Sequence, residues 1–276
     1  MPISGSTVVR RQLGRRLRRL REVAGKTDRD VEESTLASRT KLWRIESGKV
    51  PVRVADVRAL CWLYNADQAT TEALTSLAMA TVAQGWWENY GDTLPGWFSL
   101  YVGLEAAATE IRIYDPELVH GLLQIPSYLR SLYKESGVEV DEVTIQRRAK
   151  LCHERQQILT NRTPPVTLTA ILGAGVLARP VGGRKVMADQ IAQLRELGRL
   201  ETVDIRVVPW KVGAHAAMHA GAFTILDFDD RDDPSVVYVE THTGARYLEK
   251  PEELGEYRKM FDLVYRKTVP IEGYSP

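Results

Sequence analysis

The chain is poor in cysteine and in long apolar segments, and each deficit excludes a class of protein. Only Cys61 and Cys152 are present among 276 residues, which excludes a disulfide-stapled scaffold and favours a reducing compartment. No apolar run approaches the roughly 20 residues that a membrane-spanning helix needs. The first residues lead into arginines without an apolar stretch, so we expect no secretory signal, a cytoplasmic location and no membrane partner.

The chain also has little net charge, +1 in all, but that charge is unevenly distributed. Residues 1–60 hold 15 Lys and Arg against 7 Asp and Glu, whereas the remainder holds 22 basic and 29 acidic residues. The N-terminal end is therefore strongly basic and the rest of the chain is acidic. Charge polarity of this kind points to a polyanionic partner at the N-terminal end.

Residues 1–67 show the apolar periodicity of short packed helices. Thr27 and Ser38 are suitable N-caps, and Gly25 and Gly48 are suited to end helices because glycine tolerates positive φ. Helices are expected at 9–24, 28–34 and 39–47, and from about Val54. Two short helices joined by a tight turn predict a helix-turn-helix.

The second helix of that pair carries the candidate DNA contacts. Leu42 and Ile45 have the spacing of residues that face a core. The opposite face then presents the polar side chains of Arg39, Thr40, Lys41 and Arg44. Arginine can bond a guanine edge through two hydrogen bonds, and threonine can contact a thymine methyl or a phosphate. Trp43 lies beside this face, and we expect it to be a partly buried packing residue.

The segment from Leu17 to Tyr64, and above all SRTKLWRIESGK within it, resembles an XRE-type helix-turn-helix domain, the class of the phage repressors. The resemblance implies that bases are read by Arg39, Thr40 and Arg44. It implies that backbone phosphates are held by Thr27, Lys49 and Arg53. Arg21 and Glu46 match a pair that forms an internal salt bridge in this family, which makes them structural.

The chain departs from that family pattern in three places. Glu32 stands in mid helix where alanine is common, and Leu36 stands in the turn where glycine is common. Asp28 replaces a neutral polar residue close to the expected phosphate. These departures bear on how the first helix of the pair meets DNA.

Residues 68–103 are expected to connect two domains. A helix is indicated over 68–84, and a stretch rich in aromatic residues follows it. This enrichment favours a hydrophobic junction between domains, with a ligand pocket or partner-docking surface as the alternative. The candidates for such a surface are Trp86, Trp87, Tyr90 and Trp97.

Residues 104–276 mix helical and strand patterns, which predicts an α+β chain: an all-α helix-turn-helix domain followed by a mixed α/β domain with a largely antiparallel sheet. Helices are expected near 104–113, 126–134, 141–160, 184–198 and 251–267, and strands at 166–172, 203–208, 222–228 and 235–240. Segments such as GAHAAMHAGAFTILDF and SVVYVETHTGARYLEKPEEL carry a second resemblance. Through them, roughly residues 85–270 resemble a C-terminal domain fused to XRE-type domains in antitoxin-like regulators of actinobacteria. That resemblance implies a small protein partner and brings no established chemistry.

Catalytic patterns in this half are weak. Residues 173–178 have dinucleotide-fingerprint spacing, but Pro180 follows almost at once and would interrupt the helix that carries the phosphate. His215 and His219 stand four apart in an expected loop, without a third metal ligand. The side chains of residues 152–154 point in different directions on a helix. We therefore expect no enzyme, no metal and no cofactor.

These observations predict a sequence-specific DNA-binding transcriptional regulator whose C-terminal domain takes a regulatory input. We expect a homodimer, because one short recognition helix reads few base pairs and a two-fold operator supplies the rest. The alternative is an antitoxin-like interaction module that binds a small partner protein, with DNA binding as autoregulation.

Overall fold

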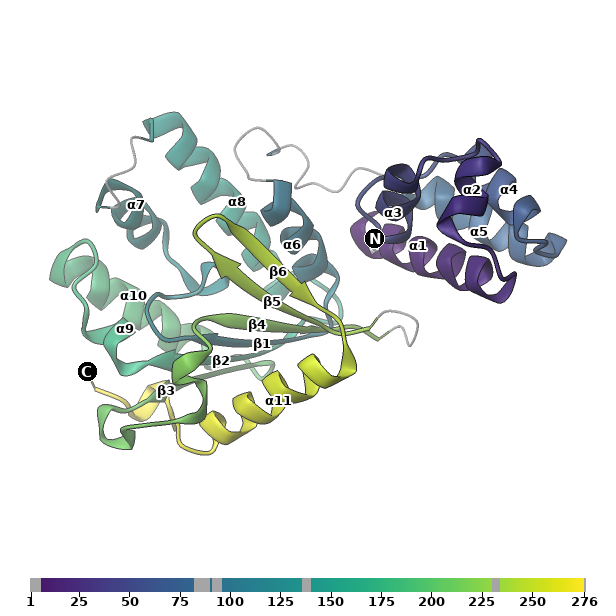
Figure 1. Cartoon of the computed structure of the whole chain (residues 1–276). Helices are drawn as coiled ribbons and strands as arrows, with labels where there is room; N and C mark the ends of the chain where they lie inside the picture. The colour runs from purple at the N-terminus through teal and green to yellow at the C-terminus, as the bar shows by residue number, and fades with distance from the viewer. Residues whose placement is uncertain (1–5, 82–89, 91–95, 136–139, 230–233, 276) are drawn as a thin grey trace. The chain divides into compact units, whose positions relative to one another are not determined.

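A computed structural model describes residues 6–81, 90, 96–135, 140–229 and 234–275, which fold into two compact units (Figure 1). The first unit contains α1 (Ser6–Val23), α2 (Asp28–Glu33), α3 (Arg39–Glu46), α4 (Val54–Leu63) and α5 (Gln68–Thr81). The second contains a seven-stranded sheet. The expected N-terminal helices, with their order and approximate bounds, are all present.

Local signals in the sequence set the ends of α1, α2 and α3. Gly25 and Gly48 follow α1 and α3 with φ of +65° and +68°, the left-handed conformation that glycine adopts without strain. The Thr27 side chain accepts a hydrogen bond from the backbone of Asp30, and Ser38 caps α3 in the same way. These caps satisfy backbone N–H groups that a helix start leaves without a partner.

One hydrophobic core joins α1 to α5. Leu13 and Leu17 of α1 and Ile45 of α3 are almost completely buried in it. Leu74 and Ala78 of α5 are buried in the same core. The helix that the sequence assigned to a connecting segment is therefore an integral part of the helical unit.

The strands of the second unit lie in the order β6-β5-β4-β1-β2-β3-β7. Their bounds are β1 (Glu110–Asp115), β2 (Thr167–Gly173), β3 (Val203–Val208), β4 (Phe223–Asp227), β5 (Val236–Thr241), β6 (Gly244–Leu248) and β7 (Val269–Pro270). β1 pairs with β2, and β2 with β3, in parallel, and the other neighbours are antiparallel. The prediction of a mixed α/β domain with a largely antiparallel sheet is confirmed.

Helices flank both faces of this sheet (Figure 1). α6 (Gly96–Ala107) precedes β1 in the chain. The helices of the second unit are α7 (Pro126–Glu135), α8 (Glu142–Thr160), α9 (Ala174–Ala178), α10 (Gly183–Leu197) and α11 (Pro251–Tyr265), with 3-10 turns at Gly121–Leu123, Trp210–Val212, Ala216–His219 and Ile271–Gly273. α11 packs Phe261 and Leu254 into a buried cluster with Phe223 and Val237 of the sheet. Figure 1 shows α7, α8 and α10 on the opposite side.

The expected helix at 104–113 is wrong in its second half. α6 ends at Ala107, and residues 110–115 form β1, which lies between β4 and β2 in the sheet. Ile111 and Ile113 are fully buried on one face of this strand, and the Arg112 guanidinium lies 3.3 Å from Asp227. The alternating pattern of EIRIYD is that of a strand, and the apolar residues of the preceding helix obscured where it begins.

Asp115, the last residue of β1, makes the stability of the sheet unit depend on pH. Burial, with a smaller contribution from the charge of Glu240, raises the pKa of Asp115 to about 8. Since an unfolded Asp titrates near about 3.9, the folded unit retains a proton that the unfolded chain releases. We expect stability to fall from pH 5 to pH 8, by up to about 1.4 kcal/mol per pH unit from this group.

Urea unfolding of the full chain, followed by hydrogen exchange in β1 and β2, measures this dependence. Asp115→Asn removes the titrating group, so the variant should lose part of the decline and be more stable than wild type at pH 8. An unchanged decline in the variant would contradict the assignment to Asp115.

Candidate nucleic-acid interface

α3 presents one apolar and one polar face, as its sequence predicts. Leu42 and Ile45 are each 1% exposed and pack into the core of the helical unit. The side chains on the outer face are exposed and belong to Arg39, Thr40, Lys41 and Arg44. The candidate base-reading residues are therefore accessible together on one helix.

Arg39, at the start of α3, is held by α2. Its Nε lies 3.0 Å from Oε2 of Glu32, and its backbone nitrogen lies 3.5 Å from Oε1 of the same carboxylate. The two terminal nitrogens of Arg39 have no partner among the described residues. The guanidinium is thus ion-paired on its Nε side, and the Arg39 side chain is 59% exposed to solvent.

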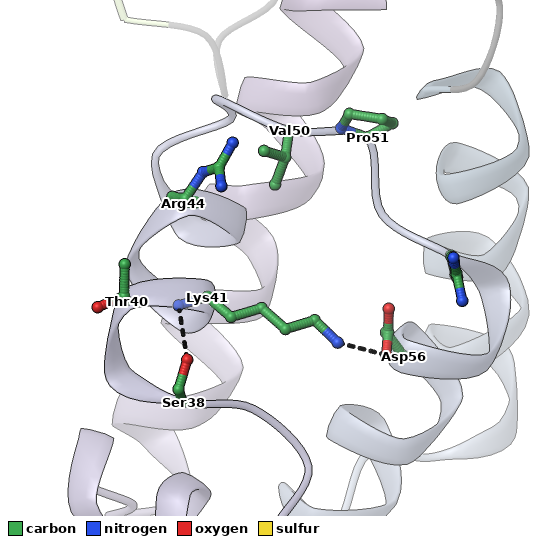
Figure 2. Close-up of a pocket in the computed structure, with 8 residues that line it drawn as sticks. Ser38, Thr40, Lys41, Arg44, Val50, Pro51 and Asp56 are labelled. Atoms are coloured by element: carbon green, nitrogen blue, oxygen red, sulfur yellow. Dashed lines mark hydrogen bonds and ion pairs between the residues drawn. The ribbon is translucent and has the colours of Figure 1, made fainter.

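Lys41 leaves α3 toward α4. Its Nζ lies 2.9 Å from Oδ1 of Asp56, and Figure 2 shows the side chain extended across a surface hollow to reach that carboxylate. The hollow has a volume of about 520 Å³ and is lined by Ser38, Thr40, Lys41, Arg44, Val50, Pro51, Arg53 and Asp56. Its lining holds three cations and one carboxylate, so it is suited to an anionic group of phosphate size.

Two of the three candidate phosphate contacts lie close to α3. Arg53 is exposed at the N-cap of α4 and lines the same hollow. Lys49 is exposed, and its Nζ lies 4.1 Å from the ring centre of Trp43. The structure thus places two further cations beside the polar face of α3.

The third candidate, Thr27, is occupied within its own helix cap. Its hydroxyl accepts from the backbone N–H of Asp30 at 3.2 Å, and its backbone N–H donates to the Asp30 carboxylate at 2.6 Å. The backbone N–H of Thr27 and, at 2.7 Å, its hydroxyl both donate to the Asp30 carboxylate, and these two bonds keep the pKa of Asp30 below its usual value. A phosphate at this helix start would have to compete with that carboxylate.

Trp43 does not have the partly buried position that its apolar character suggests. It is 55% exposed, and it stands about one helical step, roughly 100°, around α3 from Leu42. The helix buries a narrow stripe, and Trp43 falls outside it, where the Lys49 ammonium lies over its ring. An exposed aromatic residue therefore flanks the cationic face of α3.

The predicted partners Arg21 and Glu46 meet between α1 and α3. Arg21 donates from Nε and Nη2 to the two carboxylate oxygens of Glu46 at 2.7 and 2.8 Å. The two side chains are 11% and 9% exposed. Hydrogen bonding to Glu46 raises the pKa of Arg21 further above its usual range. Arg21 also lies 3.0 Å from Asp28, which gives this departure from the family pattern an intramolecular partner.

Of the four aromatic candidates for a partner surface, the structure describes the side chain of Tyr90 alone. Tyr90 is buried. Trp86 and Trp87 lie outside the described residues, as does the side chain of Trp97. Among the four candidates, the structure therefore places only Tyr90, and it lies inside rather than on a docking face.

The other candidate sites of the C-terminal half lie apart from this interface. Residues 173–178 end β2 and form the five-residue α9, too short a helix for a dinucleotide site. Within the described ranges, no three His, Cys, Asp or Glu side chains gather as metal ligands would. In that same part of the chain, no helix has the length and apolar character required to cross a bilayer.

Comparison with known families identifies both parts of the chain. Residues 12–74 match a family described as a helix-turn-helix domain. Residues 98–272 match a domain of unknown function, DUF5753. No curated protein and no solved structure matches the chain. The second match spans more than half of the sequence, so the chain belongs to the DUF5753 family and carries a helix-turn-helix domain before that region.

Proposed function

We propose that the protein is a sequence-specific DNA-binding transcriptional regulator that reads duplex DNA with the outer face of α3. One observation carries this proposal. α3 is the second helix of the helix-turn-helix, and its exposed face holds Arg39, Thr40 and Arg44. Two further cations, Lys49 and Arg53, lie beside that face. Arginine in the major groove can bond the O6 and N7 of guanine together. The flanking cations are suited to the phosphates on either side.

The charge distribution supports the same proposal. Residues 1–60 hold 15 basic and 7 acidic residues, and this excess lies in the unit that contains α3. Cations that neutralise phosphates release counterions and supply affinity for duplex DNA of any sequence. Sequence preference must then come from the few side chains on α3 that can reach base edges.

The proposal includes a homodimer and a regulatory role for the C-terminal unit. α3 runs only from Arg39 to Glu46, so one copy of the protein contacts few base pairs. Two copies on a two-fold symmetric operator would double the number of base pairs contacted. The DUF5753 region would take the input, a small molecule or a protein partner, that changes DNA occupancy. Gel filtration with light scattering, with and without duplex, tests the stoichiometry.

The base-reading assignment is tested by selecting duplexes from a random pool with the wild-type protein and measuring binding by gel shift. Arg39→Ala and Arg44→Ala are each expected to reduce the preference for the selected duplex over random duplex by about 5- to 150-fold, since a bidentate base contact contributes about 1–3 kcal/mol. Wild-type preference in both variants would show that these arginines do not read bases.

Lys49→Ala tests the phosphate assignment and should have a different signature. We expect weaker binding to selected and random duplexes alike, and a salt dependence of log K that is shallower by about one unit. Lys185→Ala, an exposed lysine of α10, serves as the charge-matched control. A loss confined to the selected duplex would contradict a phosphate role for Lys49.

A further inference from the structure

Glu32 is the residue of the helix-turn-helix that the proposed function leaves without a role. It stands on α2, where the XRE-type pattern commonly has alanine, and it faces the start of α3. A carboxylate close to a DNA-reading helix repels phosphates within a Debye length, about 8–10 Å at physiological salt. Its place beside Arg39 therefore lowers the affinity for DNA, and we ask which other property of the interface it improves.

The contact between Glu32 and Arg39 joins two points of Arg39 to one carboxylate. Oε2 lies 3.0 Å from Nε, and Oε1 lies 3.5 Å from the backbone nitrogen. That nitrogen belongs to the first turn of α3, where N–H groups lack a partner within the helix. The carboxylate thus lies close to both the guanidinium and the first turn of α3, and its charge offsets that of Arg39.

This geometry leaves one mode of base contact to Arg39. A guanidinium can meet guanine with its two terminal nitrogens or with Nε and one terminal nitrogen. Because Oε2 of Glu32 lies 3.0 Å from Nε, a guanine contact through Nε would bring its acceptors beside that carboxylate, so the terminal pair is the pair better placed to meet O6 and N7. The side chains of Arg39 and Glu32 are 59% and 45% exposed, so the contact contributes little to stability and its consequence lies in orientation.

We infer that Glu32 is a positioning residue that aims the terminal nitrogens of Arg39 at a guanine, and so sets sequence preference at the expense of overall DNA affinity. The inference rests on the proposed function. An arginine without this contact samples many rotamers and loses that freedom when it reads a base. In random duplex Arg39 needs no fixed aim, and there the carboxylate only repels.

This inference predicts opposite effects of Glu32→Gln on two duplexes. Binding of the full-length variant to a random 30-base-pair duplex should tighten by about 2- to 3-fold, because one negative charge near the phosphates is removed. The preference for the duplex selected by the wild type should fall by about 5-fold, since Arg39 loses its fixed orientation. In an Arg39→Ala background, Glu32→Gln should leave the preference unchanged.

Glu33→Gln is the matched control. Glu33 is the next residue of α2, is exposed, and pairs with Arg29 at 2.7 Å, away from Arg39. It should tighten random binding to a similar degree and leave the preference intact. Equal preference in Glu32→Gln, Glu33→Gln and wild type overturns the positioning role while the proposed function stands. A wild-type protein without preference for any duplex overturns both.

Discussion

Glu46→Ala is expected to destabilise the helical unit by about 3 kcal/mol, the lower end of the range for breaking a buried ion pair from one side, because Asp28 still pairs with Arg21 at 3.0 Å. The substitution leaves the Arg21 guanidinium, 11% exposed, without the carboxylate that accepts its Nε and Nη2 hydrogens. A unit of this size has a free energy of unfolding of about 4–11 kcal/mol, so a substantial part of its stability would be lost. Thermal unfolding followed by hydrogen exchange in α1–α5 measures the effect.

Two controls distinguish the loss of a buried ion pair from the effect of removing a carboxylate anywhere on the unit. Glu22 pairs with Arg18 at 2.8 Å on the exposed side of α1, and Glu22→Ala should cost less than about 0.5 kcal/mol. The double variant Arg21→Met with Glu46→Met should be less destabilised than the sum of its single variants, because neither charge is left alone. Additive losses would mean that the two side chains are not coupled.

Gly14→Ala is expected to destabilise the same unit by about 2–3 kcal/mol, although alanine is the better helix former by about 1 kcal/mol. A Cβ on Gly14 would overlap the carbonyl oxygen of Ile45 and lie 2.6 Å from that of Glu46. Both are backbone atoms at the end of α3, so relief requires α1 and α3 to separate. The steric term therefore exceeds the gain in helix propensity.

The matched control for this substitution is Gly255→Ala in α11, where nothing lies within 4 Å of the added Cβ. There only propensity acts, so the sheet unit should gain roughly 0.5–1 kcal/mol. Opposite signs at the two glycines, from calorimetry of the full chain, would confirm the close approach of α1 to α3. A stabilising Gly14→Ala would show that the approach is looser than described.

Much of the helical unit follows from local signals. Gly25, Gly48, Thr27 and Ser38 act within one turn of the helices that they begin or end, so the sequence alone places those ends to within a few residues. The buried stripe of α3 follows equally from Leu42 and Ile45. The pairing of Arg21 with Glu46 came from the family resemblance, since the two residues stand 25 positions apart.

The features that sequence patterns left out depend on contacts between elements. β1 is a central strand because β2 and β4 pair with it, and nothing within residues 110–115 identifies those partners. α5 belongs to the helical unit because Leu74 reaches the shared core. The contacts of Arg39 with Glu32 and of Lys41 with Asp56 likewise join separate helices, and periodicity along one helix says nothing about them.

Site-directed cross-linking at Thr40 tests most directly whether the outer face of α3 lies against base edges. Both native cysteines, Cys61 and Cys152, are buried, so a single exposed thiol can be introduced. Thr40→Cys is mixed with the selected duplex carrying a disulfide-activated tether on a major-groove base edge, and Ala73→Cys on α5 serves as the control. We predict a disulfide cross-link for Thr40→Cys, competed by unmodified selected duplex, and none for Ala73→Cys. Failure of Thr40→Cys to cross-link at every tether position, while the complex forms, would contradict the account.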